Sequence, residues 1–299
     1  MRYPETQRPP LPDWMKVRLK MGTSATSGSV RNVVATRKLV TVCEEASCPN
    51  LGHCWGHGTA TFMVMGDRCT RRCGFCDIRT AKPQALDPDE PLRVAEAIRD
   101  MGLKHAVITS VDRDDLADCG STHFANVVLK TRALNPNTTI EVLIPDFKGR
   151  KEDLERIYQA KPEIINHNVE TVPSLYKDIC PQSSYSVSLA VLEQSASRGF
   201  LTKSGIILGL GETIPEVEQV LRDLRAAGVG LATIGQYLQP SAAHAPLKGF
   251  IPPEVFTELY EYGMSIGFLH IESGPLVRSS YHAGEALDRI LGQHRASEI

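Results

Sequence analysis

The stretch TFMVMGDRCTRRCGFC, residues 61–76, joins a short apolar run to a loop that holds three cysteines. The run 61–65 is typical of a buried strand, and Cys69, Cys73 and Cys76 follow it directly. Three thiolates on one loop can hold three irons of a [4Fe–4S] cube and leave the fourth iron open. The stretch therefore predicts a strand whose carboxyl end carries an iron–sulfur site.

A second cysteine triplet lies upstream, in the pattern C-x4-C-x5-C formed by Cys43, Cys48 and Cys54. A structural metal site takes four protein ligands, so each triplet leaves one position for another ligand. The alternatives are a zinc site and a disulfide framework, which is typical of short secreted chains. Because the chain has 299 residues and no secretory apolar region near its start, we favour two iron–sulfur clusters. Turn residues within 49–56 predict a loop around the upstream cluster.

Overall composition sets further limits. A hydrophobic content of 42% in 299 residues is enough for a sizeable core, in one large domain or two small ones. The net charge of −2 argues against general nucleic-acid binding, and no apolar run is long enough to span a membrane. Thiols that bind iron must stay reduced, which favours a cytoplasmic location.

Residues 1–40 form a basic segment, which contains eight Lys and Arg residues but only two acidic residues, Glu5 and Asp13. Such a segment is compatible with a solvated tail, an organelle transit peptide or a contact surface for an acidic protein partner. Residues 1–42 are rich in Pro and then in Gly, Ser and Thr. We therefore expect an extended arm, docked through Trp14.

From residue 60 onward, short apolar runs alternate with amphipathic stretches, the pattern of repeated βα units and a parallel sheet. The predicted strands span residues 61–65, 105–111, 139–144, 164–169, 202–208 and 231–237. The predicted helices span residues 92–101, 124–132, 152–160, 186–198, 215–227 and 253–266, and a short run at 268–271 precedes a terminal helix after residue 283. Six βα units predict an α/β fold that forms an open, three-quarter parallel barrel rather than a complete barrel of eight.

This pattern divides the chain into three parts. Residues 1–58 form an arm and a cluster-binding extension, residues 59–272 form the barrel, and residues 273–299 form a C-terminal extension. Functional residues in parallel βα folds lie at the carboxyl ends of the strands. Polar residues and glycines follow the predicted strands at 109–115, 168–171, 209–212 and 236–241. We expect cofactor and substrate at this rim.

The C-x3-C-x-F-C loop resembles the cluster loop of radical S-adenosylmethionine (SAM) enzymes. Together with other motifs, it makes the chain resemble the lipoyl synthase family from about residue 14 to about residue 285. These motifs are TSVDRDDL at 109–116, HFA at 123–125, PDFKG at 145–149, NHNVET at 166–171, GLGE at 209–212 and GPLVRSSY at 274–281. Because the resemblance begins so early, it favours a working role for the basic segment over a transit peptide.

The resemblance implies a sulfurtransferase that inserts sulfur at C6 and C8 of an octanoyl-lysine on a lipoyl carrier domain. The carrier would be a 2-oxoacid dehydrogenase E2 subunit or the glycine cleavage H protein, and the electron donor a ferredoxin or flavodoxin. The resemblance also implies two [4Fe–4S] clusters and SAM. Cys69, Cys73 and Cys76, the SAM triplet, would hold the cluster that cleaves SAM to a 5′-deoxyadenosyl radical. The upstream cysteines, the auxiliary triplet, would hold the cluster that donates sulfur.

The fourth ligand of the auxiliary cluster maps by this resemblance to Ser280 of the RSSY motif, and less favourably to Ser279. A hard alkoxide is a poor partner for iron that prefers thiolate, so this bond should break first during sulfur transfer. Ser280 is accordingly the predicted catalytic residue. Residue type and position alone would instead favour His53, His57, Cys119 or Cys180.

The resemblance further implies contacts to SAM. They are Thr109 and Ser110 for the methionyl amine, Asn168 and Glu170 for the ribose, and Phe75 with the backbone of residues 208–211 for the adenine. The alternative for Asn168 and Glu170 is a helix cap, and GLGE alone is compatible with a simple turn.

The chain departs from the family pattern at Cys180-Pro181, where an Arg-Pro pair is expected. The missing arginine leaves one anion contact open, such as a contact to the SAM carboxylate. Lys203 or Arg198 could supply the charge, although a surface position is expected for both.

Three other functions compete with this interpretation. A radical SAM methylthiotransferase also pairs two clusters, but it normally carries an added nucleic-acid-binding module and a basic surface. A biotin-synthase-like enzyme would lack the compact upstream triplet. An electron-transfer protein would close both clusters with four cysteines and would need no barrel.

Overall fold

The computed structural model describes residues 10–16, 25–45, 48–56, 60–285 and 287. Its centre is one sheet with the strand order β1-β2-β5-β6-β7-β8-β9-β10. The strands are β1 Val40–Thr41, β2 Thr61–Val64, β5 His105–Ser110, β6 Thr139–Leu143, β7 Ile164–Asn166, β8 Leu201–Leu208, β9 Leu231–Gln236 and β10 His270–Gly274. β1 runs antiparallel to β2, and all other neighbours are parallel. A separate pair, β3 Arg68–Cys69 and β4 Arg79–Thr80, lies beside the sheet.

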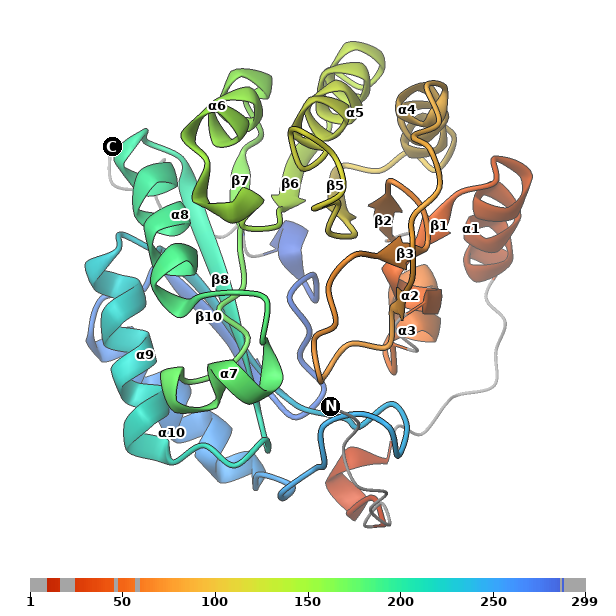
Figure 1. Ribbon diagram of the computed structural model, residues 1–299. Coiled ribbons are helices and arrows are strands. Elements are labelled where there is room, and N and C mark those ends of the chain that lie inside the picture. The colour runs from red at the N-terminus through yellow and green to blue at the C-terminus, as the bar shows by residue number, and fades with distance from the viewer. Residues whose placement is uncertain (1–9, 17–24, 46–47, 57–59, 286, 288–299) are drawn as a thin grey trace, which may run out of the picture.

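The described chain forms ten helices, of which α4, α5, α6, α8, α9 and α10 lie between successive parallel strands, as parallel pairing requires a crossover. The ten helices are α1 Ala25–Thr36, α2 Val42–Glu45, α3 Leu51–Gly56, α4 Glu90–Asp100, α5 Ser121–Leu134, α6 Lys151–Ala160, α7 Tyr176–Ile179, α8 Tyr185–Ser197, α9 Ile214–Ala226 and α10 Pro253–Ser265. Short 3-10 turns lie at Asp13–Met15, Phe147–Gly149 and Pro173–Leu175. Figure 1 shows α4, α5, α6, α8, α9 and α10 on the outside of the curved sheet, with the blue C-terminal segment inside the curve.

The predicted open parallel barrel is confirmed. All six predicted strands form in the predicted order, and the run at 268–271 leads into β10, a seventh parallel strand that pairs with β9. β1 and β10 lie at opposite ends of the strand order, so the described sheet does not close. Residues 283–285 and 287 are helical, and the rest of the predicted terminal helix lies outside the described residues.

Two predictions about the first sixty residues are wrong. Residues 25–36 form α1 instead of an extended arm, because Val30, Val33 and Val34 have helical spacing and pack on the core. Trp14 does not dock the arm: its exposed fraction is 48%, whereas that of Met15 is 3%. The loop predicted around the auxiliary triplet is partly helical: Cys43 lies on α2 and Cys54 on α3, whereas Cys48 lies between the two helices.

Several charges of the basic segment are engaged within the molecule. Arg37 pairs with Glu96 and Asp100 of α4. The guanidinium of Arg31 lies 5.7 Å from the ring centroid of Trp55, within the range of a cation–π contact. In its described part, the segment therefore fastens α1 and α3 to the barrel.

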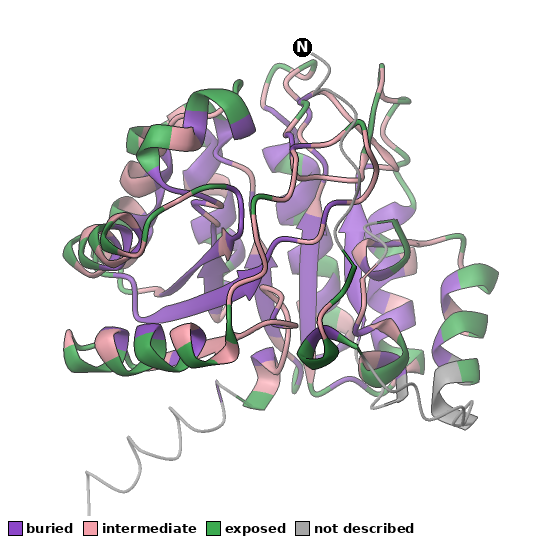
Figure 2. Cartoon of the chain, turned by 90° about the horizontal axis from the view of Figure 1, so that it is seen from below, coloured by how far each residue is buried: buried purple, intermediate pink, exposed green. Residues whose placement is uncertain are grey.

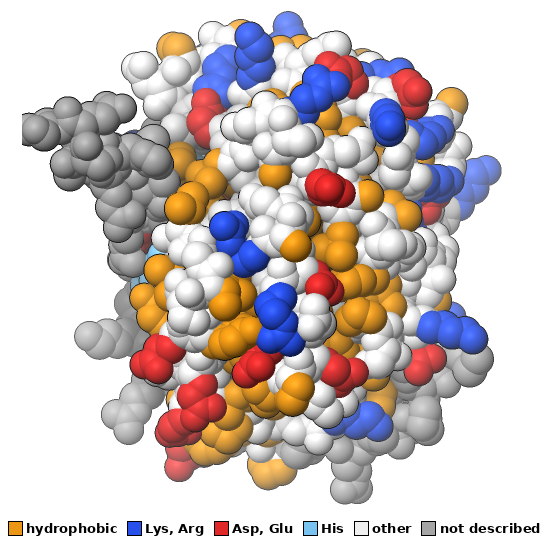
Figure 3. Space-filling model, turned by 90° about the vertical axis from the view of Figure 1, so that its left-hand side faces the viewer, with side chains coloured by type: hydrophobic (Ala, Val, Ile, Leu, Met, Phe, Trp, Pro, Cys, Tyr) orange, Lys and Arg blue, Asp and Glu red, His pale blue; other side chains and the backbone are white. Residues whose placement is uncertain are grey.

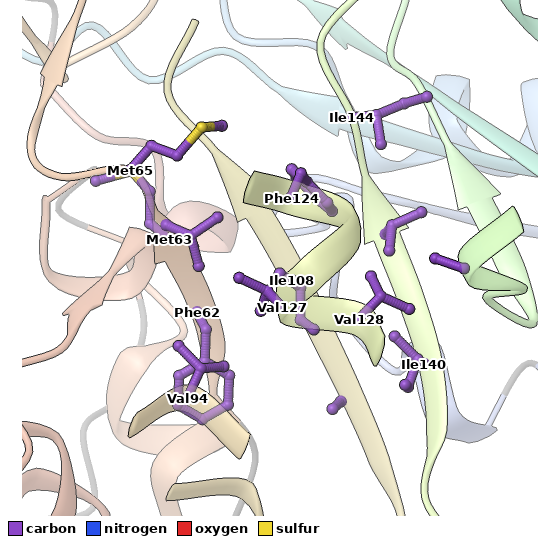
Figure 4. Close-up of a cluster of buried hydrophobic side chains, with 14 of the residues drawn as sticks. Phe62, Met63, Met65, Val94, Ile108, Phe124, Val127, Val128, Ile140 and Ile144 are labelled. Carbon is purple, nitrogen blue, oxygen red and sulfur yellow. The ribbon is translucent and has the colours of Figure 1, made fainter. Parts of the chain in front are cut away.

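The main hydrophobic core lies between the sheet and its outer helices. Figure 4 shows Phe62, Ile108 and Ile140 of three neighbouring strands facing Val94 of α4 and Val127 of α5. These side chains are buried, and Figure 2 shows the matching pattern on the helices, purple toward the sheet and green outward. Burial of each such side chain stabilises the fold by about 1.5–3 kcal/mol.

The outer surface is mixed in character. On the face that carries α8, α9 and α10, Figure 3 shows Lys and Arg side chains interspersed with Asp and Glu, with hydrophobic side chains exposed between them. Tyr260 and Met264 of α10 are among the exposed hydrophobic residues. Within the described residues, none of the helices has the length and apolar character that a membrane crossing requires.

The inside of the sheet contains a buried ionic group. Lys203 Nζ of β8 lies 2.9 Å from Glu141 Oε1 of β6, and both residues are buried. Asn166 Nδ2 donates to the same Glu141 oxygen at 3.2 Å. Burial alone opposes ionisation of Glu141, but Lys203 and His105 outweigh it and hold its pKa at about 2. The carboxylate is thus ionised and paired inside the barrel.

Removing one partner of this pair should be costly. We expect Lys203→Met to lower the free energy of unfolding by about 3–5 kcal/mol, because it leaves Glu141 as an unpaired buried charge. The matched control is the double variant Glu141→Leu with Lys203→Met, which should regain most of that loss. Anaerobic urea unfolding measures both, and a single variant as stable as the parent would contradict the assignment.

Candidate cluster and cofactor site

The carboxyl ends of the parallel strands open into a cavity of about 540 Å³. Its wall contains all the residues whose side chains the sequence predicts to contact SAM or its cluster, namely Cys69, Cys73, Phe75, Cys76, Thr109, Ser110, Asn168 and Glu170. They come from the loop after β2, from the end of β5 and from the segment after β7. The structure thus brings the residues of three separate motifs around one space.

The SAM triplet lies on a loop whose apex is fixed at Gly74. The Gly74 amide donates to the carbonyl of Ile179 at 2.7 Å, and its carbonyl accepts from the Ala245 amide at 2.8 Å. Nearby, His244 Nε2 lies 3.1 Å from the carbonyl oxygen of Cys76. Backbone segments after β7 and β9 therefore hold the cysteine loop over the cavity.

Arg71 fixes the other side of this loop. Its buried guanidinium lies 2.7 Å from Asp114 Oδ2 and 2.7 Å from Asp146 Oδ1, on the loops that follow β5 and β6. Asp112 also faces Arg71, and burial raises the pKa of Asp112 to about 6 although Arg71 opposes the shift. Sequence alone does not distinguish Arg71 from Arg72, because only the fold brings the three carboxylates around Arg71 together.

Two polar atoms in the cavity wall have no hydrogen-bond partner within the described residues. They are Ser110 Oγ and Asn168 Oδ1, and both are buried. The hydroxyl of Thr109, by contrast, donates to the carbonyl of Leu143 at 3.0 Å. Buried polar atoms without a partner are costly, so Ser110 and Asn168 fit a bound polar ligand better than Thr109 does.

Glu170 is placed for a ligand rather than for a helix cap. Its φ is +65°, and burial raises its pKa to about 7 against a hydrogen bond from Asn168. The nearest helical turn, Pro173–Leu175, begins after Val172 instead. The helix-cap alternative for Asn168 and Glu170 is therefore wrong.

The predicted adenine contact of residues 208–211 needs correction. The cavity is lined at β8 by Gly205, Ile206 and Ile207. The following GLGE turn folds on itself, since the Glu212 carboxylate accepts hydrogen bonds from the amides of Gly209 and Leu210. GLGE therefore forms a turn whose Gly209 and Leu210 amides are already bonded to Glu212. Of the predicted adenine contacts, Phe75 is the one that lines the cavity.

The suggested replacements for the missing arginine are also wrong. Lys203 is paired with Glu141, and Arg198 lies on the surface beside Glu155, with their charged atoms 2.8 Å apart. Cys180 stands at the departure itself, buried in the cavity wall. Its contact with Cys73 raises the pKa of the Cys73 thiol, together with burial. Arg71 and Arg278 are the arginines among the residues that line the cavity.

The auxiliary triplet surrounds a small hollow next to this cavity. The wall of the hollow comprises Cys43, Cys48, Asn50, Cys54, Ala60, Thr61, Arg278, Ser280 and Tyr281. Ser280 therefore lies with the three cysteines, as its predicted role as a ligand requires. Ser279 lines the main cavity instead.

Two hydrogen bonds hold the C-terminal segment beside the auxiliary triplet. Asn50 Nδ2 donates to the carbonyl of Leu276 at 2.7 Å, and Arg278 Nη1 donates to the carbonyl of Gln236 at 3.1 Å. Between them, a Cβ on Gly235 would lie 2.2 Å from the carbonyl oxygen of Val277. Glycine is required there because any side chain would displace the passing backbone.

The other candidate ligands are placed elsewhere. The His53 ring lies 5.9 Å from that of Tyr281, outside the wall of the hollow. Cys119 lies 3.4 Å from Arg150 Nη2 on the loop that precedes α5, and Cys180 belongs to the main cavity. His57 lies outside the described residues.

Comparison with known proteins decides the family. Residues 63–224 match the model of the radical SAM superfamily. A curated lipoyl synthase of Leptospira biflexa is 55% identical over 92% of this chain and 90% of its own length. A lipoyl synthase of Flavobacterium psychrophilum is 54% identical, over 91% of this chain and 93% of its own. The chain belongs to the lipoyl synthase family. It is accordingly a sulfur-inserting radical SAM enzyme that uses SAM and a [4Fe–4S] cluster.

Solved structures agree with the fold of this family. The chain resembles Streptococcus suis SuiB bound to the precursor peptide SuiA, with a TM-score of 0.57 and 11% identity over 75% of this chain and 52% of that one. It also resembles the FeFe-hydrogenase maturase HydG from Carboxydothermus hydrogenoformans, with a TM-score of 0.56 and 13% identity over 88% and 70%. At these identities the likeness concerns the fold alone.

The chemistry of the donor atoms fits the cofactors of the family. Burial raises the pKa of Cys54, Cys69 and Cys76 to about 12 each, so these thiols need a bound metal to become thiolates. A cubane can be held by such triplets, because each of its cysteines binds a different iron. The donor atoms of the two triplets therefore fit iron–sulfur clusters.

The SAM affinity should depend on pH through Glu170. SAM carries a sulfonium cation, and below a pKa of about 7 the carboxylate is protonated. We therefore expect affinity to fall with decreasing pH, by up to about tenfold per unit below pH 7. The variant Glu170→Gln should bind more weakly at about pH 8 and lose this dependence.

Anaerobic equilibrium dialysis of the cluster-loaded enzyme measures this effect. Glu163→Gln is the matched control, because Glu163 pairs with Arg132 away from the cavity wall. An unchanged pH dependence in Glu170→Gln would assign the titration to another group.

Proposed function

We propose that this enzyme inserts sulfur at C6 and C8 of an octanoyl chain attached to a lysine of a lipoyl carrier domain. One observation carries the proposal: the cavity lined by the SAM triplet reaches residues that are next to the auxiliary cysteines in the chain. The main cavity extends from the SAM triplet to Val42 and Pro49, which flank Cys43 and Cys48, and Arg278 lines both the cavity and the hollow. An alkyl chain held there would meet both sites.

Two clusters are part of this proposal. When bound, the cluster on the SAM triplet supplies the electron that cleaves SAM to a 5′-deoxyadenosyl radical, and the auxiliary cluster supplies sulfur. The protein's own task is to position the reacting groups. Hydrogen abstraction from an unactivated carbon requires reacting atoms in near contact, and well-oriented groups can contribute about 7–11 kcal/mol of the barrier.

The cavity wall suits this division of labour. Ser110, Asn168 and Glu170 contribute polar atoms to this wall, whereas Met63 and Val277 contribute apolar surface. An alkyl chain gains free energy from apolar surface removed from water, about 25 cal/mol per Å². The wall thus favours SAM and an aliphatic acyl chain side by side.

The partners follow from the same chemistry. We propose an octanoylated E2 subunit or glycine cleavage H protein as the carrier, and ferredoxin or flavodoxin as the electron donor. The lipoyl synthases match nearly the whole chain; the mitochondrial lipoyl synthase of Nematostella vectensis, for example, aligns with 92% of it. This extent supports a shared reaction.

The reaction is tested with an octanoyl-lysyl lipoyl domain, SAM and a reductant under anaerobic conditions. Mass spectrometry should show that the domain loses two hydrogens and gains two sulfurs. A lipoyl domain without its octanoyl group is the control and should stay unchanged. Cleavage of SAM with an unmodified octanoyl domain would keep the radical chemistry and reject the substrate.

Ser280 should control sulfur release. Ser280→Cys is expected to retain the auxiliary cluster, since thiolate binds iron well, but to abolish the second sulfur insertion because that iron no longer leaves readily. Ser279→Cys is the matched control, as Ser279 faces the main cavity. Iron content and product mass measure both effects, and full turnover by Ser280→Cys would contradict the role.

A further inference from the structure

Arg278 has an unusual place between the two sites. It lines both the main cavity and the hollow of the auxiliary triplet. Its Nη1 donates to the carbonyls of Gln236 at 3.1 Å and Val277 at 2.7 Å. Both acceptors are neutral backbone groups, so they orient the guanidinium without balancing its charge.

No carboxylate forms an ion pair with Arg278 in the part of the chain that the structure describes. Arg278 is partly buried, whereas the two fully buried arginines Arg71 and Arg113 each have a carboxylate partner: Arg71 pairs with Asp114 and Asp146, and Arg113 pairs with Asp115 at 2.9 Å. Burial lowers the pKa of Arg278. An arginine nevertheless keeps its proton in proteins.

A cation that is partly withdrawn from water and has no counterion is destabilising. The fold retains one beside the auxiliary triplet, so an anion must be expected there. Three thiolates and an alkoxide carry more negative charge than an iron–sulfide cube carries positive charge. A cluster on Cys43, Cys48, Cys54 and Ser280 would therefore supply the missing anion.

We propose that Arg278 is the counterion of the auxiliary cluster, and that its charge sets the reduction potential of that cluster. The inference rests on the proposed function, in that it requires the auxiliary triplet to hold a cluster. Arg278 is a positioning residue by this argument. A nearby positive charge stabilises the more negative, reduced state, because net charge and hydrogen bonds set cluster potentials.

The test uses full-length protein in which Cys69, Cys73 and Cys76 are replaced by Ala, so that the auxiliary cluster is the one to be measured. Into this background we introduce Arg278→Gln, which removes the charge, and Arg278→Lys, which keeps it. Arg225→Gln is the matched control, because Arg225 also donates to a backbone carbonyl, that of Val229, but on the outer helix α9. Iron and sulfide content, and the midpoint potential followed by EPR, are measured for each.

We expect Arg278→Gln to shift the potential to more negative values, or to lose iron, while Arg278→Lys and Arg225→Gln stay close to the parent. A potential that is unchanged in Arg278→Gln would overturn the inference. Equal losses in Arg278→Gln and Arg278→Lys would also overturn it, since shape rather than charge would then matter.

Two further outcomes separate this inference from neighbouring ones. If Arg278→Gln in the six-cysteine protein weakens SAM binding and leaves the auxiliary potential unchanged, the guanidinium serves the SAM carboxylate and the inference fails. If the background variant with Arg278 intact takes up no iron, the auxiliary cluster itself is rejected, and the proposed function fails with it.

Discussion

Ser280 reaches the auxiliary triplet because the backbone of Val277 crosses the end of β9 at a glycine. The space at Gly235 is too small for a methyl group, and the hydrogen bonds of Asn50 and Arg278 hold the crossing segment from both sides. Much of the candidate chemistry depends on this crossing. It completes the hollow of the auxiliary triplet and also forms part of the wall of the main cavity.

The SAM triplet is held by a different principle. Its loop is short, but it gains rigidity from the backbone bonds at Gly74 and from the ion pairs of Arg71. Each contact comes from a loop at the carboxyl end of another strand. The curved sheet therefore acts as a frame that brings separate loops together, which explains why cofactor sites in parallel folds lie at this edge.

Sequence reasoning was most reliable where local pattern and fold agree. The periodicity of apolar residues predicted the six strands and the open sheet, and the spacing of the cysteines predicted two groups. It missed α1, because the Gly and Ser residues before Val30 concealed the helical spacing of its valines. It could not foresee the partners of Arg71, which depend on long-range contacts.

The site residues show the same difference between what local sequence predicts and what depends on long-range contacts. Resemblance placed Ser280 correctly with the auxiliary triplet, whereas residue type alone would have favoured histidines or loose cysteines. Lys203 was also suggested as an anion contact, yet inside the barrel it forms an ion pair with Glu141. The backbone of residues 208–211 was assigned to adenine by motif, but the Glu212 side chain occupies its amides. Such ion pairs and hydrogen bonds join side chains to partners that the sequence alone does not identify, so they are found only in the folded structure.

The crossing at β9 also bears on the order of events during synthesis. Asn50 and its partner Leu276 are 226 positions apart in the chain. Proteins emerge from the ribosome amino-terminus first, and earlier parts begin to fold while later parts are still being made. Cys43, Cys48 and Cys54 are therefore made long before Ser280, which follows most of the barrel. The hollow that these four residues line is completed late in the life of the nascent chain.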